Sequence, residues 1–551
     1  MERRRPVRGR RGRAVREELV RRDDLHGDVH LLRGRDVPHP QREDRGAVQA
    51  GDALRQRVHD AAQPGRHRGR PRDERGRRLR QGGAESPAGL QRQPPHPYPP
   101  VPHRRSVAIV SPEQAKAAAE RILERALRSA DEAEVFYAAS SSTPVRFEAN
   151  IIKGVDANDA MGAALRIIKD GRVGFSSTSN LDDTQALVDA ALETAPFGAE
   201  AHFEFPGAQP YPDVHPYDSS VEEATLEEMV ALGERAIADL RAHSTEAQIE
   251  GGVGKSTSTL ALVNSRGGSV AYERSRFQIG FEGTVIRGED MLFTMDSESN
   301  VAVLNDPSTV VQSVIRQLEW AKETAAVETK SMPVILMPTA VRSVLLSPLL
   351  AGLNGKSVLQ GTSPLVGRLG ERIVDERFSL TDDPTLADAG GARPADDECV
   401  ASRRLPLIES GVASAFFYDL QTAGQAGVAS TGAGERGLGS LPGPSTSVLL
   451  VDEGDAALDD IIAGMDEALI VERLLGAGQS NVLGGDFNAN VLLGYKVQNG
   501  RVAGRVKNTM ISGNAYRALN DVLALGSEGR WMGSLYAPAI AVGGISVSSK
   551  G

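Results

Sequence analysis

A glycine-rich run, GGVGKST at residues 251–257, is the segment of the 551-residue sequence whose residue types most directly suggest chemistry. The backbone N–H groups of such a run bind phosphate when a buried strand precedes it and a helix follows it. Here the preceding residues, 245–250, are polar, and the following residues, 258–263, alternate like a strand. The segment LLVDE at 449–453 is similar to the second sequence motif of nucleotide-binding proteins. The glycine-rich run, however, lacks the buried strand before it and the helix after it that phosphate binding requires. A nucleotide-dependent switch is therefore the least favoured of our alternatives.

Residues that could ligate a metal ion are scarce in the part of the chain that carries a regular apolar pattern. Its histidines are His202, His215 and His243, and none has a glutamate at the helical spacing of a metalloprotease. We interpret them as surface residues. The single cysteine, Cys399, follows three acidic residues, which raise a thiol pKa, so we interpret it as a bystander. One cysteine also excludes a disulfide framework and favours a reducing, cytoplasmic compartment.

The stretch SPLLAGLNGKSV, residues 347–358, has the pattern of a short buried helix. Ser347 is a natural N-cap, and Pro348 suits the first helical position. Three leucines follow at helical spacing and give the helix an apolar face. An apolar strand candidate at 334–337 and a helical run at 341–346 come before it. By itself, the stretch predicts a helix of the hydrophobic core.

Start signals for helices and turn signals for hairpins give the organisation of the chain. Capping boxes at 111–114 and 225–228 each begin a helix with an apolar stripe. Strand candidates at 133–138 and 145–151 follow the first helix, and an Asn-Gly turn at 499–500 is the strongest hairpin signal. These signals predict an α+β protein. We expect a disordered Arg/Pro-rich extension at 1–110, a small N-terminal α+β domain at 111–200, a central α+β domain at 221–328 and a large β-rich C-terminal domain at 331–551.

Charge is distributed very unevenly along the chain. Residues 1–105 contain 27 Arg, no Lys and 14 acidic residues, so the remainder carries −23 within the net charge of −10. The first segment has almost no periodic apolar residues, so we expect it to be disordered, and its composition is typical of GC-rich DNA read in a wrong frame. We expect translation to begin near Val107 or Val110; an Arg-rich nucleic-acid tail is the weaker alternative. The acidic remainder should repel nucleic acid, and no apolar run approaches the ~20 residues of a membrane helix.

Three C-terminal segments carry a family resemblance. They are IESGVASAFFYDLQTAGQAG at 408–427, the segment 448–476 from VLLVDEGD to VERLLG, and the segment 484–514 from GGDFNAN to MISGN. Their order and spacing resemble those of the TldD/PmbA family of metalloprotease-related proteins, most closely its PmbA/TldE branch. A weaker match covers 134–195, and together the resemblance spans about residues 111–551.

The resemblance also gives the apolar helix a functional meaning. In metal-binding members of the family, a helix at this place carries His-Glu-x-x-x-His, and the resemblance places its metal-site positions on Ser347, Pro348 and Gly352. None of the three can ligate zinc through an imidazole or act as a general base. The resemblance therefore implies a PmbA/TldE-like subunit without a metal or other cofactor in this chain and without catalytic residues of its own.

The complex that the resemblance implies is a cytoplasmic TldD–TldE heterodimer, with zinc on the TldD-like partner. That partner would cleave unfolded peptides in an enclosed channel which this chain helps to form. A peptide held as an added β-strand would be gripped through its main chain, which suits broad sequence tolerance. A homodimer of this chain is the alternative to the heterodimer, and neither nucleic acid nor a membrane is expected as a partner. The alternative from another class is a non-proteolytic regulatory or binding protein of the gyrase-modulator type.

Overall fold

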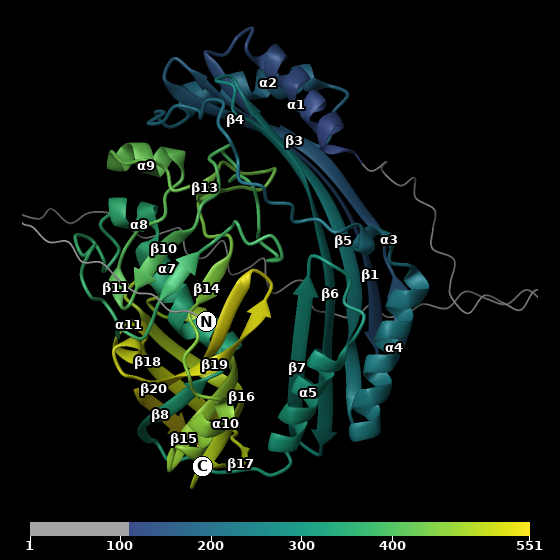
Figure 1. Cartoon of the computed structure of the whole chain (residues 1–551), viewed down its shortest axis with the longest axis vertical. Coiled ribbons are helices and arrows are strands. Elements are labelled where there is room, and N and C mark those ends of the chain that lie inside the picture. The colour runs from purple at the N-terminus through teal and green to yellow at the C-terminus, as the bar shows by residue number, and fades with distance from the viewer. Residues whose placement is uncertain (1–109, 551) are drawn as a thin grey trace, which may run out of the picture. The chain divides into compact units, whose positions relative to one another are not determined.

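The computed structural model describes residues 110–550 (Figure 1). The predicted extension at 1–110 lies outside the described residues except for Val110. Within residues 110–550, no helix combines the length and the apolar character needed to cross a bilayer.

The first sheet contains seven antiparallel strands in the order β4-β3-β1-β5-β6-β7, with β2 paired to the C-terminal end of β1. Its longest strands, β1, β5 and β6, have 17, 17 and 19 residues. The bounds are β1 Glu132–Glu148, β2 Ile151–Val155, β3 Asn158–Lys169, β4 Arg172–Thr178, β5 Gln248–Asn264, β6 Ser269–Arg287 and β7 Asp290–Asn300.

Helices cover one face of this sheet in two groups. The apolar stripes of α1 and α2 pack on the end that contains β3 and β4, and those of α4 and α5 pack on the other end of the long strands (Figure 1). Alternate residues of β1, such as Val135 and Phe147, supply both cores, because successive side chains of a strand point to opposite faces. The bounds are α1 Pro112–Ala126, α2 Thr184–Thr194, η1 Ala195–Phe197, α3 Ser219–Glu223, α4 Leu226–His243 and α5 Ser308–Trp320.

The sequence predicted two strands, at 133–138 and 145–151, where the structure has the single strand β1. The serine-rich stretch between them, 140–144, contains no apolar alternation and ends in Pro144. It is nevertheless paired on its β5 side, because the register between Glu134 and Phe147 runs without interruption. The prediction of two strands is wrong because pairing with long neighbours, rather than side-chain alternation, sets the length of this strand.

The second sheet contains eleven strands in the order β11-β10-β9-β14-β20-β18-β16-β15-β8. An additional pairing between β8 and β20 closes β20, β18, β16, β15 and β8 into a ring, while β17 pairs with β16 and β19 with β20. The bounds are β8 Lys330–Leu336, β9 Leu380–Asp382, β10 Leu405–Glu409, β11 Val412–Ala413, β14 Leu449–Val451, β15 Glu467–Leu475, β16 Asp486–Gln498, β17 Arg501–Arg505, β18 Thr509–Asn514, β19 Val522–Met532 and β20 Leu535–Ser549; β12 Gly434–Glu435 and β13 Gly443–Pro444 form a separate pair.

Short helices complete the C-terminal region, and one of them carries the candidate site. The run from α6 to α7 packs its leucines and valines against β8, β15, β18 and β20 in a single core. The bounds are α6 Pro338–Val341, η2 Arg342–Leu346, α7 Ser347–Leu353, α8 Gly355–Leu359, α9 Leu420–Ala426, α10 Leu458–Ala463, η3 Ala477–Gln479 and α11 Ala515–Leu519.

The predicted fold class, α+β with a large β-rich C-terminal region, is confirmed. Strands from the predicted first domain (111–200) and from the predicted central domain (221–328) lie in one continuous sheet, joined by the β1–β5 pairing. The boundaries between the domains stay a prediction.

Candidate functional site

The candidate helix is one continuous helical segment from Pro338 to Leu353 with a wider turn in its middle. The turn, η2, is a π-helix, and the Ser347 N–H donates to the carbonyl of Arg342, five residues back. Pro348 has no N–H, so a regular α-helix would leave the carbonyl four residues before it without its partner. A π turn directly before a proline accommodates that loss. The prediction that Ser347 caps a new helix is wrong, because its backbone is already helical, with φ −57° and ψ −46°.

The three positions of the family's metal motif differ in exposure. Pro348 and Gly352, four residues apart, are both buried on the same side of the helix, whereas Ser347 is exposed. The Ser347 hydroxyl donates to the Arg342 carbonyl at 2.9 Å and so serves the helix itself. The set offers one hydroxyl and no nitrogen, sulfur or carboxylate donor, so it does not fit zinc.

Tyr516 of α11 fills the space next to Gly352. A Cβ built at Gly352 would overlap the Tyr516 hydroxyl oxygen, and one built at Gly485 would lie 2.6 Å from the Tyr516 Cδ2. Among residues 110–550, the buried Tyr516 hydroxyl has no hydrogen-bond partner, and burial raises its pKa to about 12. A neutral phenol therefore occupies the place that a side chain at position 352 would need. Sequence reasoning missed Tyr516, because nothing in its neighbourhood along the chain links it to the helix.

The other candidate metal ligands are the three histidines and Cys399. In the described part of the chain, no three His, Cys, Asp or Glu side chains are grouped so that they could hold a metal ion. His215 pairs with Asp213 at 2.6 Å and His243 with Glu319 at 2.8 Å. Cys399 is fully buried, and burial, together with nearby carboxylates, raises its thiol pKa well above the ordinary value, as its acidic neighbours predicted.

The backbone N–H of His202 donates to Gln421 at 3.1 Å, so this histidine lies against α9 of the C-terminal region.

The glycine-rich run at 251–257 lies inside β5 and is not a phosphate loop. Both of its edges are paired, with β1 on one side and β6 on the other, so its N–H groups point along the sheet. Lys255 donates to the carbonyls of Glu222 and Ala224 at 2.7 and 2.6 Å. Gly251 needs to be glycine, because its φ is +150° and a Cβ there would overlap the carbonyl of Gly280. The second nucleotide-like stretch provides β14.

A buried ion cluster joins the first sheet to the C-terminal region. Arg166 of β3 binds Glu134 of β1 at 3.0 Å and Glu398, in the segment between β9 and β10, at 2.6 Å. Arg436 binds Glu134 at 2.7 Å, and all four side chains are almost fully buried. Burial raises the pKa of Glu398 to about 8, against the opposing effect of Arg166. No sequence signal indicates this cluster, because its two pairs between the sheet and the C-terminal region, Arg166–Glu398 and Glu134–Arg436, join residues 232 and 302 positions apart.

Sequence profiles of known families match two parts of the chain. The profile of the PmbA/TldA metallopeptidase C-terminal domain matches residues 329–549, and that of PmbA/TldA metallopeptidase domain 1 matches residues 133–195. Together they cover more than half of the chain. The chain belongs to the PmbA/TldD family.

Relatives and solved structures agree with this assignment over most of the described residues. An uncharacterized protein of Methanocaldococcus jannaschii is 25% identical over 76% of this chain and 97% of its own length. A protein named metalloprotease PmbA homolog, from Haemophilus influenzae, is 23% identical over 74% of this chain and 90% of its own. The crystal structure of TldE from Thermococcus kodakarensis matches with a TM-score of 0.73 and 24% identity, over 78% of this chain and 100% of that one, which shows a shared fold.

Proposed function

We propose that this chain is the PmbA/TldE-like subunit of a two-component metallopeptidase, inactive alone and active with a zinc-bearing TldD-like subunit in the cytoplasm. One observation carries the proposal. In a chain of a metallopeptidase family, the helix that would hold the metal offers Ser347, Pro348 and Gly352, and Tyr516 fills the space beside it. Such a chain keeps the family's scaffold without the groups that activate water.

The contribution of this subunit would be to position unfolded peptides for its partner. Within residues 110–550, β7 pairs with β6 alone, and Gln317 binds the N–H and the carbonyl of Met295 on its other edge. β19 pairs with β20 and also bridges Ala456 at Gly526. An added strand would therefore use the parts of these edges that these contacts leave open. Main-chain hydrogen bonds to such an edge hold a peptide with little regard to its sequence. Zinc would belong to the partner, and this chain would supply part of the wall of the substrate channel.

The test compares the full chain alone with the full chain mixed with a TldD-like protein that carries His-Glu-x-x-x-His. Metal content is measured by mass spectrometry, cleavage with a fluorogenic oligopeptide, and assembly by light scattering after gel filtration. We expect no metal and no cleavage for the chain alone, and chelator-sensitive cleavage by a heteromer in the mixture. Stoichiometric zinc together with cleavage in the single-component sample would overturn the proposal. A chain that forms no complex with the TldD-like protein would favour the non-proteolytic regulatory alternative.

A further inference from the structure

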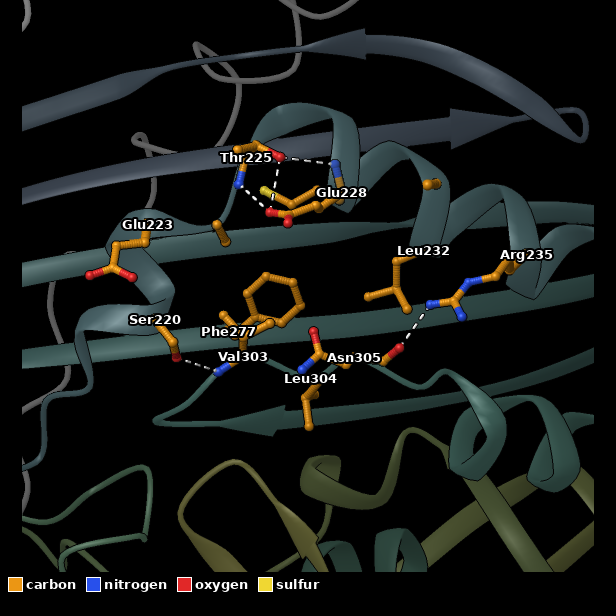
Figure 2. A pocket seen from close by; sticks show the side chains of 13 residues that line it. Ser220, Glu223, Thr225, Glu228, Leu232, Arg235, Phe277, Val303, Leu304 and Asn305 are labelled. Atoms are coloured by element: carbon orange, nitrogen blue, oxygen red, sulfur yellow. Dashed lines mark hydrogen bonds between the residues drawn. The ribbon is translucent and has the colours of Figure 1, made fainter.

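The open groove beneath α4 offers little to a ligand, although its volume is about 510 Å³ (Figure 2). Its apolar side chains, Met229, Leu232 and Phe277, are at most 4% exposed. Arg235 at its rim donates to the carbonyl of Asn305 at 2.7 Å (Figure 2). A smaller cavity between the first sheet and the C-terminal region has charged walls whose charges are not all paired.

This smaller cavity has a volume of about 40 Å³ and lies where β7 and α5 meet β15, β19 and the start of α6. A buried water molecule needs about 10–15 Å³ of such a volume, so the cavity has room for roughly three particles of that size. Its charged walls consist of three arginines and two carboxylates. They are Arg316 of α5, Arg473 and Glu472 of β15, Arg530 of β19 and Asp296 of β7.

Two of the three arginines are neutralised by the two carboxylates. Arg316 binds Glu472 at 3.0 Å. Arg530 forms an ion pair with Asp296 and donates to the hydroxyl of Ser313 at 3.2 Å. The cavity therefore has one positive charge in excess, which belongs to the third arginine.

Arg473 is the arginine of this cavity that has no ion-pair partner within residues 110–550. Its guanidinium donates to the carbonyl of Met295 at 3.3 Å. The side chain is half-buried, and burial lowers its pKa, against the opposing effect of Asp296, Glu472 and Glu282. A desolvated cation without a close counter-charge is costly, so an anion beside Arg473 would stabilise the folded chain.

Two further features of the walls favour an anion. The buried Nε–H of Arg316 has no hydrogen-bond partner in the described part of the chain. The helical segment that begins at Pro338 starts at this cavity, and its start has no side-chain cap. The N-terminal end of a helix carries a partial positive charge, which adds to that of the guanidinium.

We propose that this cavity binds a small monovalent anion, chloride in particular, against the guanidinium of Arg473. One negative charge balances the excess of the walls. Phosphate and sulfate, with four oxygens each, need more room than roughly three water molecules occupy. Since the walls come from both the first sheet and the C-terminal region, the anion would hold these two parts together. The site requires no zinc-bearing partner, so it is independent of the proposed function.

The first test measures the melting temperature of the full chain alone by scanning fluorimetry. Sodium chloride replaces sodium gluconate at constant ionic strength, because gluconate is too large for the cavity. We expect a saturable rise of about 1–3 °C with chloride, since a ligand that binds only the folded state stabilises it. No rise with chloride would overturn the proposal.

Two arginine variants locate the effect. Arg473→Gln should remove the rise with chloride, because it removes the excess charge of the cavity. Arg501→Gln is the matched control, since Arg501 of β17 is exposed, has no ion-pair partner among the described residues and does not line the cavity. This control should keep the rise. An equal rise in R473Q and R501Q would overturn the assignment to Arg473.

A second measurement needs no variant and is therefore independent of how well a variant folds. Bromide carries the charge of chloride, is only slightly larger and scatters X-rays anomalously. Crystals of the full chain soaked in sodium bromide should show an anomalous peak in the cavity, within contact distance of the Arg473 guanidinium. Electron density of water alone in the cavity, without an anomalous peak, would overturn the proposal.

Discussion

Replacing Arg166 with methionine should strongly destabilise the connection between the first sheet and the C-terminal region. The guanidinium lies 3.0 Å from the Glu134 carboxylate and 2.6 Å from that of Glu398, and all three side chains are at most 3% exposed. Methionine keeps much of the apolar packing but leaves the carboxylates with one cation fewer. Breaking a buried ion group by removing one partner costs about 3–5 kcal/mol, because the remaining charge is buried without compensation.

The size of this loss should depend on pH through Glu398. Burial raises the pKa of Glu398 from 4.5 to about 8, so the folded state binds more protons at this group than the unfolded state does. The contribution of Glu398 to wild-type stability therefore falls as the pH rises from 4.5 to about 8. Without Arg166, the charged form of the Glu398 carboxylate is still less stable in the folded protein. The R166M penalty should be smaller at about pH 5 than at about pH 9, because protonation removes the unpaired charge.

Urea unfolding of the full chain, followed by circular dichroism at both pH values, measures the effect. Arg287→Met is the matched control, because Arg287 forms an exposed ion pair with Glu246 and its loss should not change the unfolding midpoint measurably. An R166M midpoint no lower than that of R287M would refute the assigned role of the cluster. A penalty that is the same at both pH values would refute the assignment of the titrating group to Glu398.

Four further substitutions test single packing claims. Tyr516→Phe should leave the melting temperature unchanged or raise it, with a gain of up to about 1 kcal/mol, because it removes a buried hydroxyl without a hydrogen-bond partner; a clear loss would contradict this. Gly352→Ala should destabilise by about 1–3 kcal/mol, and the Tyr516→Phe background should recover part of that loss in a thermal double-mutant cycle, since the overlap is with the hydroxyl oxygen. Gly251→Ala should speed hydrogen exchange across β5, because a residue with φ of +150° would be strained and its Cβ would meet a carbonyl; unchanged protection would argue against that geometry. Glu398→Gln should flatten the dependence of stability on pH between 4.5 and about 8, and an unaltered slope would assign it to another group.

Features set by neighbours in the sequence could be predicted. The capping boxes of Ser111 and Thr225 form as expected, because each consists of a hydroxyl and a side chain three residues later. The polar residues before the glycine-rich run correctly excluded a phosphate loop, since the run lies in β5. The α+β class followed from the succession of such local signals.

Features set by distant pairing could not be predicted. β1 extends through a serine-rich stretch because β5 pairs with that stretch without interruption. The serine-rich stretch has no alternation of apolar and polar residues, so the sequence of β1 alone does not indicate this pairing. The residues next to Ser347 in the sequence indicate an N-cap, but in the structure the helix is already continuous from Pro338. A π turn directly before Pro348 accommodates the N–H that this proline lacks. The contact between Gly352 and Tyr516 joins residues far apart in the chain, so neither residue type alone indicates it.

The most direct test of the central claim is the zinc content and the chelator-sensitive peptidase activity of the full chain, purified alone and then mixed with a TldD-like protein. The account predicts no bound zinc and an intact fluorogenic peptide for the chain alone, with cleavage only in the mixture. One zinc ion per chain and cleavage by the chain alone would contradict it.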